Sequence, residues 1–140
     1  MPSPGWPEHL PVSAVRVARP TDRLEECVRF YRDALGLVEL GGFTGHAGYD
    51  GVMLGLPDGT VHLELTSHVD GSPGPAPSRD NLLVLYLPDR AAVDVVAARL
   101  AAAGHPAVEP ENPYWLARSV TVEDPDGWRV VLVDEGYDAG

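Results

Sequence analysis

The chain has 140 residues, of which 44% are hydrophobic and 22% charged, and its formal net charge is −11. This composition is typical of one folded domain, and the acidity disfavours nucleic-acid binding because no cluster of Lys or Arg offsets it. No apolar run approaches the roughly 20 residues that cross a bilayer, and the single cysteine excludes an internal disulfide, so we expect a cytoplasmic protein.

The first half of the chain combines one helical pattern with several short strand patterns, after a Pro-rich arm over residues 1–11. Asp22 and Glu25 form a capping-box pattern, and apolar residues then recur at helical spacing until Gly36, which predicts a helix over 22–35. Alternating apolar residues and glycine-containing turns predict strands over residues 12–19, 37–43, 49–54 and 60–66. Residues 12–66 therefore form one predicted β-α-β-β-β module.

A second module follows a connector rich in Pro, Gly and Ser over residues 67–80. Asp89 caps a second predicted helix, and Gly104 ends it. The remaining patterns predict strands over residues 81–87, 107–108, 117–123 and 128–134, before a short tail over 135–140. The order of elements in residues 81–134 thus repeats that of the first module.

Short motifs recur in the second half, 67 or 68 residues after their first appearance: Asp22-Arg23 as Asp89-Arg90, Gly36 as Gly104, and Pro57-Asp58-Gly59 as Pro125-Asp126-Gly127. This repetition indicates an internal duplication. Each module has one helix, which can cover only one face of its sheet, so the opposite faces remain for a ligand or another surface. We predict an α+β fold of two tandem β-α-β-β-β modules, with curved mixed sheets that form a concave groove within one structural domain.

Glu64 lies on an otherwise apolar strand, and because burying a lone carboxylate is costly it is the first candidate for a functional residue. His62 lies two residues earlier, so the two side chains share one face of the strand. In one interpretation that face is open to water while the alternate apolar residues pack under the helix. In the other, the pair lies in the groove, with Glu64 paired to Arg16 or Arg129.

Aromatic residues provide a second set of candidates. Tyr114 and Trp115, in a loop bounded by prolines, can form a flat binding wall, or Trp115 can simply anchor the loop on the core. Tyr49, which follows a glycine-rich loop, can line the mouth of a groove or be a turn residue. Cys27 lies beside the apolar stripe of the first helix, and we expect an inert, buried thiol.

Two motifs carry a family resemblance. Residues 30–37 (FYRDALGL) resemble the helix end of vicinal oxygen chelate proteins, the glyoxalase/bleomycin-resistance superfamily, and residues 123–128 (EDPDGW) resemble their last hairpin. Both motifs lie at the expected places of a duplicated chain. The stretches ARPT, GYDGVMLGLP, HLEL and NPYW also resemble a less characterised branch of that superfamily.

In the metalloenzymes of this superfamily, four side chains on the concave face hold a divalent metal, one on the first and one on the last strand of each half. The resemblance places these positions at Arg16, at Glu64, within residues 81–83, and at Val131 or Leu132. Only Glu64 is a good ligand, because Arg16 stays protonated and the aliphatic side chains have no donor atoms. We therefore expect neither a metal nor another cofactor.

The resemblance implies a metal-free protein that binds a small molecule, similar to members that confer antibiotic resistance by sequestering a drug. An aromatic or cationic ligand and a homodimer are expected, with no nucleic acid and no membrane involved, and the ligand contacts are expected from Arg16, Tyr49, His62, Glu64, Tyr114, Trp115 and Arg129. The alternative is a glyoxalase- or dioxygenase-type enzyme (lyase, isomerase or dioxygenase) in which Glu64 or His62 acts as general base, with or without a divalent metal. A metabolic sensor that binds a metabolite and a protein is a third possibility.

Overall fold

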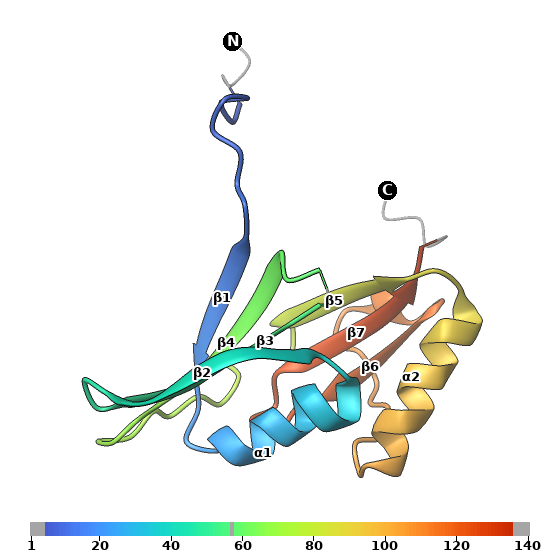
Figure 1. The fold of residues 1–140 in the computed structure, drawn as a ribbon. Coiled ribbons are helices and arrows are strands. Elements are labelled where there is room, and N and C mark those ends of the chain that lie inside the picture. The colour runs from blue at the N-terminus through green and yellow to red at the C-terminus, as the bar shows by residue number, and fades with distance from the viewer. Residues whose placement is uncertain (1–4, 57, 136–140) are drawn as a thin grey trace.

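A computed structural model describes residues 5–56 and 58–135 of the chain. The first module forms a sheet of four strands in the order β1-β4-β3-β2 (Figure 1), with bounds β1 (Val15–Pro20), β2 (Val38–His46), β3 (Tyr49–Gly55) and β4 (Val61–His68). β1 runs parallel to β4, and the other two pairs are antiparallel. The predicted order of strands is confirmed, although β1 begins three residues later than predicted.

The second module forms a separate sheet of three strands in the order β5-β7-β6 (Figure 1), with bounds β5 (Leu82–Leu87), β6 (Ser119–Glu123) and β7 (Arg129–Asp134). Its first and last strands, β5 and β7, pair in parallel, as β1 and β4 do in the first module. The additional strand predicted at residues 107–108 is reduced to an isolated bridge between Val108 and Thr121. The fold is α+β with two tandem modules, as predicted.

The first helical segment differs from the continuous α-helix predicted over 22–35. It consists of α1 (Leu24–Val28) followed by a π-helical segment, η1 (Arg29–Leu35), and ends at Gly36 with φ +100°. The predicted capping box is wrong, because no side chain caps α1 and the Asp22 carboxylate accepts a hydrogen bond from the Ser72 backbone instead. The sequence pattern could not show that the connector competes for Asp22.

The second helix, α2 (Arg90–Ala102), is capped as predicted. The Asp89 carboxylate accepts a 2.8 Å hydrogen bond from the backbone N–H of Ala92, which satisfies one of the free donors at the helix start. Gly104 follows the last turn with φ +96°. A short 3-10 segment, η2 (Pro113–Trp115), lies in the loop before β6.

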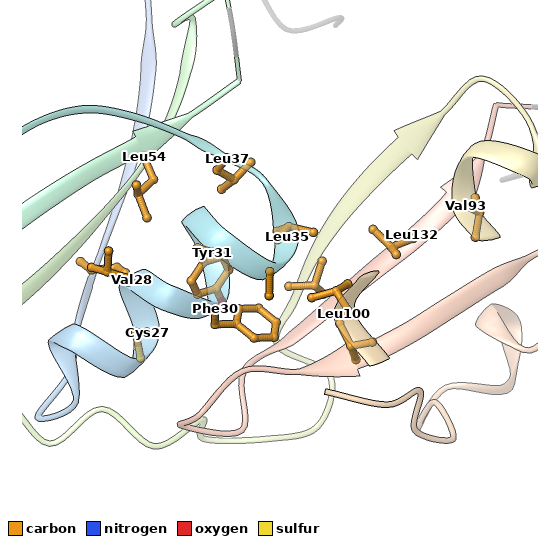
Figure 2. Packing of buried hydrophobic residues seen from close by; sticks show 14 residues of the cluster. Cys27, Val28, Phe30, Tyr31, Leu35, Leu37, Leu54, Val93, Leu100 and Leu132 are labelled. Carbon is orange, nitrogen blue, oxygen red and sulfur yellow. The ribbon is translucent and has the colours of Figure 1, made fainter. Parts of the chain in front are cut away.

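One hydrophobic core joins the two modules. Figure 2 shows Phe30 and Leu35 of the first helical segment on the side of Leu100 of α2 and Leu132 of β7, with the Tyr31 ring beside Phe30. Phe30 and Leu100 are at most 1% exposed, and Leu54 and Leu65 of the first sheet belong to the same cluster. The helix-bearing sides of both sheets therefore face the shared core. Their opposite sides point away from this core. We call them the inner faces, because the predicted groove would lie on them.

A buried polar network, which we call the latch, holds the second hairpin against the first module. The Arg19 guanidinium donates to Asp124 at 2.7 Å and to Asp126 at 3.0 Å, and it lies 5.3 Å from the centre of the Trp128 ring. Tyr31 donates to the same Asp124 oxygen at 2.7 Å. Arg19, on β1, is only 6% exposed, so the hairpin around residues 124–128 covers it.

The pKa values of the two latch carboxylates are shifted in opposite directions. Burial raises the pKa of Asp124, although Arg19 and Tyr31 stabilise its charged form. Burial alone would also raise the pKa of Asp126, but hydrogen bonds from Thr21, Arg19 and Cys27 outweigh it and hold that pKa below its ordinary value. The latch is thus sensitive to protonation at Asp126.

Among residues 5–56 and 58–135, none of the helices combines the length and the apolar character needed to cross a bilayer.

Candidate functional site

Arg16 and Glu64 form an ion pair on the inner face of the first sheet. Arg16 lies opposite His62 in the β1–β4 ladder, and Ala18 lies opposite Glu64, so the alternation of side chains along the strands places all four on one face. The Arg16 Nη1 lies 3.5 Å from Glu64 Oε2. The side chain of Arg16 is 46% exposed and that of Glu64 is 16% exposed, so the pair is reachable from solvent without being fully solvated.

His62 shares this face, but its ring contacts the turn that precedes its own strand, β4. Nε2 contacts the carbonyl oxygen of Gly59, which can only accept, so Nε2 carries the proton in the neutral ring. Nδ1 is then the acceptor, and it is buried without a partner in the described part of the chain. Nε2 is therefore engaged, whereas Nδ1 keeps a free lone pair but is buried from solvent.

The surroundings of the ion pair are mostly apolar. Met53 lies opposite Glu64 in the β3–β4 ladder, and the Leu40 side chain lies over Gly55, the neighbour of His62. On the next strand pair, the Phe43 ring lies directly over Gly51. Absence of a Cβ at these glycines lets the apolar groups lie close to the sheet. The face thus offers an apolar surface beside one ion pair, whose arginine lies on the edge strand β1.

The four positions at which the superfamily resemblance would place metal ligands do not fit a metal. Arg16 fills the first position as a cation and already pairs with Glu64 at the second. On the second sheet, Leu82 lies opposite Arg129, and Val131 shares their face, so the third and fourth positions present aliphatic side chains. Within the described residues, no three His, Cys, Asp or Glu side chains gather as a metal site would require.

The second inner face is closed where the first is open. Val131 and Val133 are fully buried on it, whereas Leu132 points to the shared core. Arg129 is 5% exposed and is committed to its own module, donating to Glu123 at 3.1 Å and to the carbonyl of Glu109 at 2.9 Å. Of the two partners expected for Glu64, the structure therefore provides Arg16 and not Arg129.

The aromatic candidates lie away from the ion pair in the chain. Tyr114 and Trp115 form η2 beside β6, with ring centres 4.9 Å apart in an edge-to-face arrangement, and Asn112 caps the turn. Tyr49 begins β3 and stacks edge-to-face on His68, with ring centres 4.5 Å apart. The structure brings Arg16, His62 and Glu64 together on one sheet, while Tyr114 and Trp115 belong to the other module.

Sequence reasoning missed one feature, an apolar cleft of about 300 Å³ between the two modules. It lies mainly on the helix side of the first sheet, beside the edge strand β5, and its lining includes Val17, Arg19, Leu56, Val61, Leu83 and Leu85. Val17 and Val61 alternate along their strands with the inner-face residues. This alternation places them on the side of the cleft, and it is the signal in the sequence that could have indicated the cleft. His62 and Arg129 also border this cleft.

The comparisons with known proteins agree with this architecture. The model of the YycE-like N-terminal domain matches residues 15–66, and that of the YycE-like C-terminal domain matches residues 80–134. The chain belongs to the YycE-like family. An uncharacterized member, YycE of Bacillus subtilis, is 48% identical over 120 residues, which cover 86% of each chain.

Solved structures extend the likeness from the YycE-like family to the superfamily. The crystal structure of YycE from Bacillus subtilis, a protein of unknown function, has a TM-score of 0.87 at 44% identity, covering 95% of this chain and 97% of that one. An antibiotic binding protein from Streptomyces sp. CB03234 has a TM-score of 0.66 at 25% identity over 90% of this chain and 98% of its own. A glyoxalase I of Leishmania major shares the fold, with a TM-score of 0.68 at 20% identity over 86% of this chain and 84% of its own. The predicted membership of the vicinal oxygen chelate superfamily is confirmed.

Proposed function

We propose that this YycE-like chain binds a small aromatic cation on the inner face of its first sheet and carries out no reaction on it. The observation that carries the proposal is the Glu64 carboxylate, which is 16% exposed and held by Arg16 beside an apolar surface. A partly desolvated carboxylate attracts a cation more strongly than a solvated one does. The net charge of −11 also favours a cationic ligand. The apolar surface around Phe43 and Met53 suits an aromatic ring.

The chemistry of the pair supports binding over catalysis. Nε2 of His62 is engaged by the Gly59 carbonyl and Nδ1 is buried, so the ring is not exposed as a general base would need to be. The four ligand positions of the superfamily supply one suitable donor, so metal-assisted chemistry has no support in these side chains. That the Streptomyces neighbour is an antibiotic binding protein fits a sequestering role.

We further propose that two copies complete the site. β1 is an edge strand and its neighbouring inner face is open, whereas a binding groove needs walls on more than one side. A homodimer with twofold symmetry would bring a second surface over this face. The aromatic residues Tyr49, Tyr114 and Trp115 would then serve as walls. A reducing cytoplasm suits the proposed location, because the one cysteine is buried and unpaired.

The proposal is tested by binding of two dyes of similar size and opposite charge, proflavine and fluorescein, followed by fluorescence anisotropy. The wild-type protein should bind the cationic dye and not the anionic one. Glu64→Gln should weaken proflavine binding at least about tenfold, because the charged partner is lost. The control Glu39→Gln, on an exposed ion pair with Arg32, should leave binding unchanged. Equal binding of proflavine to both variants would exclude Glu64 as the site.

Metal analysis tests the sequestering function against the enzymatic one. Chelator-treated protein should show no rise in melting temperature with Ni²⁺, Zn²⁺, Mn²⁺ or Fe²⁺, because one carboxylate does not hold these ions. A metal-dependent rise that Glu64→Ala abolishes would contradict the proposal. It would make glyoxalase and dioxygenase assays the next step.

A further inference from the structure

A hollow of about 570 Å³, which we call the helix hollow, opens where the first helical segment lies beside α2 (Figure 1). Within the described residues, its lining comes from these helices and neighbouring loops, and from no strand of either sheet. Both modules contribute side chains to it. The charged and polar residues of the lining are Arg23, Glu26, Arg29, Asp33, Arg99 and His105.

Two arginines of this hollow differ from all others of the chain in how their charge is balanced. The chain has ten arginines and no lysine. Within residues 5–56 and 58–135, every arginine except Arg29 and Arg99 forms an ion pair with Asp or Glu. Both exceptions line the helix hollow. In a chain with a net charge of −11, cations without a carboxylate partner at one place indicate a site for an anion.

Arg29, on η1, keeps its guanidinium open to a ligand. The residue is exposed, and its side chain donates no hydrogen bond within the described part of the chain. The carboxylate of Asp33 lies in the same hollow, but both of its oxygens accept from Arg32, at 2.9 and 3.3 Å. These bonds are the main reason that the pKa of Asp33 lies below its ordinary value, and the charge of Arg29 adds to the effect. Asp33 is therefore committed to Arg32 and leaves the N–H donors of Arg29 unbonded.

Arg99, on α2, is a cation in a fixed position. Its Nε donates to the carbonyl of Ala34 at 2.9 Å, and its Nη2 contacts the carbonyl of Leu35. The guanidinium lies over Gly36, where a Cβ would overlap Nη2. The end of a helix carries only roughly half a negative charge, so these carbonyls balance part of the guanidinium charge and not all of it. Nη1 has no partner among the described residues and is left for a ligand.

The other polar groups of the hollow do not cancel this positive charge. Arg23 and Glu26 form an ion pair with each other at 3.8 Å. The His105 ring is held edge-to-face on Phe30, with ring centres 4.8 Å apart, and in the described part of the chain its nitrogens make no hydrogen bond. One ring N–H of His105 can therefore donate to the same anion.

We propose that the helix hollow binds the phosphate group of a small phosphorylated molecule between Arg29 and Arg99. A phosphate monoester carries close to two negative charges near pH 7 and has several strong acceptor oxygens, which guanidinium groups match in geometry. A nucleic acid or an anionic membrane does not fit, because the remaining surface of so acidic a chain repels extended negative charge. The site is separate from the cation site proposed at Glu64, so one chain would bind two ligands of opposite charge.

Glycerol phosphate is the probe for this site, and its phosphorus NMR signal reports binding to the full chain at constant ionic strength. The wild type should shift this signal in a saturable manner. Glycerol tests the part of the probe without the phosphate, and succinate tests two separate carboxylates of similar total charge. An equal concentration of either compound should leave the probe bound, because neither presents a compact dianion to both arginines.

Arg29→Gln is the decisive variant, because Arg29 is exposed and unpaired and its replacement should leave the melting temperature unchanged. It should raise the dissociation constant of glycerol phosphate at least about fivefold, since a charge-assisted contact is lost. The matched control Arg90→Gln removes the same charge from the exposed pair with Asp94 and should change that constant by less than about twofold.

The outcomes separate this inference from the proposed function. A phosphorus signal that the wild type does not shift, or equal binding by Arg29→Gln and Arg90→Gln, overturns the phosphate site. Displacement of the probe by an equal concentration of succinate or glycerol overturns the assignment to a phosphate group. Glu64→Gln should leave binding of glycerol phosphate unchanged, and Arg29→Gln should leave binding of proflavine unchanged, so that either site can fail without the other.

Discussion

Arg19 connects the two modules through charge as well as packing. Its guanidinium lies between two carboxylates of the second hairpin and beneath the Trp128 ring, and its Nε is buried without a partner in the described part of the chain. A buried cation is costly to desolvate, so the ion pairs add little net stability by themselves. Removing the cation is destabilising mainly because it leaves its partner carboxylates buried without a counter-charge. Asp124 would be the first of these.

Replacement of Arg19 by Ala should lower the free energy of unfolding by about 3–5 kcal/mol, because it leaves Asp124 buried without its cation. Urea denaturation followed by circular dichroism measures the change. The matched control Arg90→Ala removes an exposed pair with Asp94 on α2 and should cost no more than about 0.5 kcal/mol. Equal losses in the two variants would show that the latch does not stabilise the fold.

Asp126 predicts how the stability responds to acid. Its pKa is held below the ordinary value of about 3.9, so its carboxylate stabilises the native state above that pH and loses this contribution as the pH falls through the lowered pKa. The raised pKa of Asp124 acts in the opposite sense. Asp126→Asn should therefore flatten the loss of stability below about pH 4, measured by urea denaturation at a series of pH values, and the exposed control Asp94→Asn should not.

Individual residues show how far sequence reasoning reached into the site. The alternation along the strand was enough to predict that Glu64 shares a face with His62. One of the two interpretations left open also paired Glu64 with Arg16 or Arg129, and the structure has the pair with Arg16. Local pattern could not reveal that His62 turns back to Gly59, or that Arg129 is taken by Glu123, because both depend on contacts that form only in the folded sheets.

Among the elements, the connector between the modules has a structural part that its composition concealed. Residues 67–80 lack any periodicity, yet Gly74 lies against β1, where its carbonyl accepts the Trp128 indole N–H at 2.7 Å. Ser72 and Gly74 are buried, and Ala76 donates to the carbonyl of Asp126 at 3.0 Å. The connector is therefore packed into the latch and does not act as a loose tether.

Gly74→Ala tests this packing. A Cβ at this position would overlap the backbone carbonyl of Pro20, which cannot move without displacing β1, so we expect a loss of about 2–3 kcal/mol in the free energy of unfolding. Pro77→Ala, at an exposed position of the same connector, is the control and should change stability by less than about 0.5 kcal/mol. Thermal or urea denaturation distinguishes the two. Wild-type stability of Gly74→Ala would mean that the connector can be displaced without cost.

Helix limits were predictable where one residue decides them and unpredictable where several compete. Asp89 and Gly104 bound α2 as their chemistry requires. By contrast, η1 ends with the Tyr31 carbonyl accepting from the N–H groups of both Gly36 and Leu37. Asp22 is diverted from the helix start by the Ser72 backbone of the connector. A periodicity of three and four residues cannot distinguish an α-helix from a π-helical segment such as η1.

At the scale of the whole molecule, the repeat predicted the two modules correctly but not their relative placement. The modules share one core through their helix sides, with Phe30 edge-to-face on His105 and Arg99 bonded to the carbonyl of Ala34. Duplication alone leaves open whether the helix sides or the inner faces meet. The helix sides meet in the structure, and no periodic pattern marks the contacts that join them, the latch among them.

A shared core predicts that the modules unfold together. Tryptophan fluorescence, to which Trp128 in the latch contributes together with Trp6 and Trp115, and circular dichroism, which reports on both sheets, should give one coincident transition in urea. The same comparison on Arg19→Ala should shift both signals equally. Two separated transitions in the wild type would show that each module is stable by itself.

The outward placement of the first inner face also bears on how this protein can change over generations. Arg16, Met53 and Phe43 lie on the side of the sheet opposite the core, so replacing them removes little of the buried area that keeps the chain folded. Substitutions at these positions therefore cost little stability. A lineage with this architecture can acquire affinity for a different small molecule by a few substitutions, without first having to become more stable.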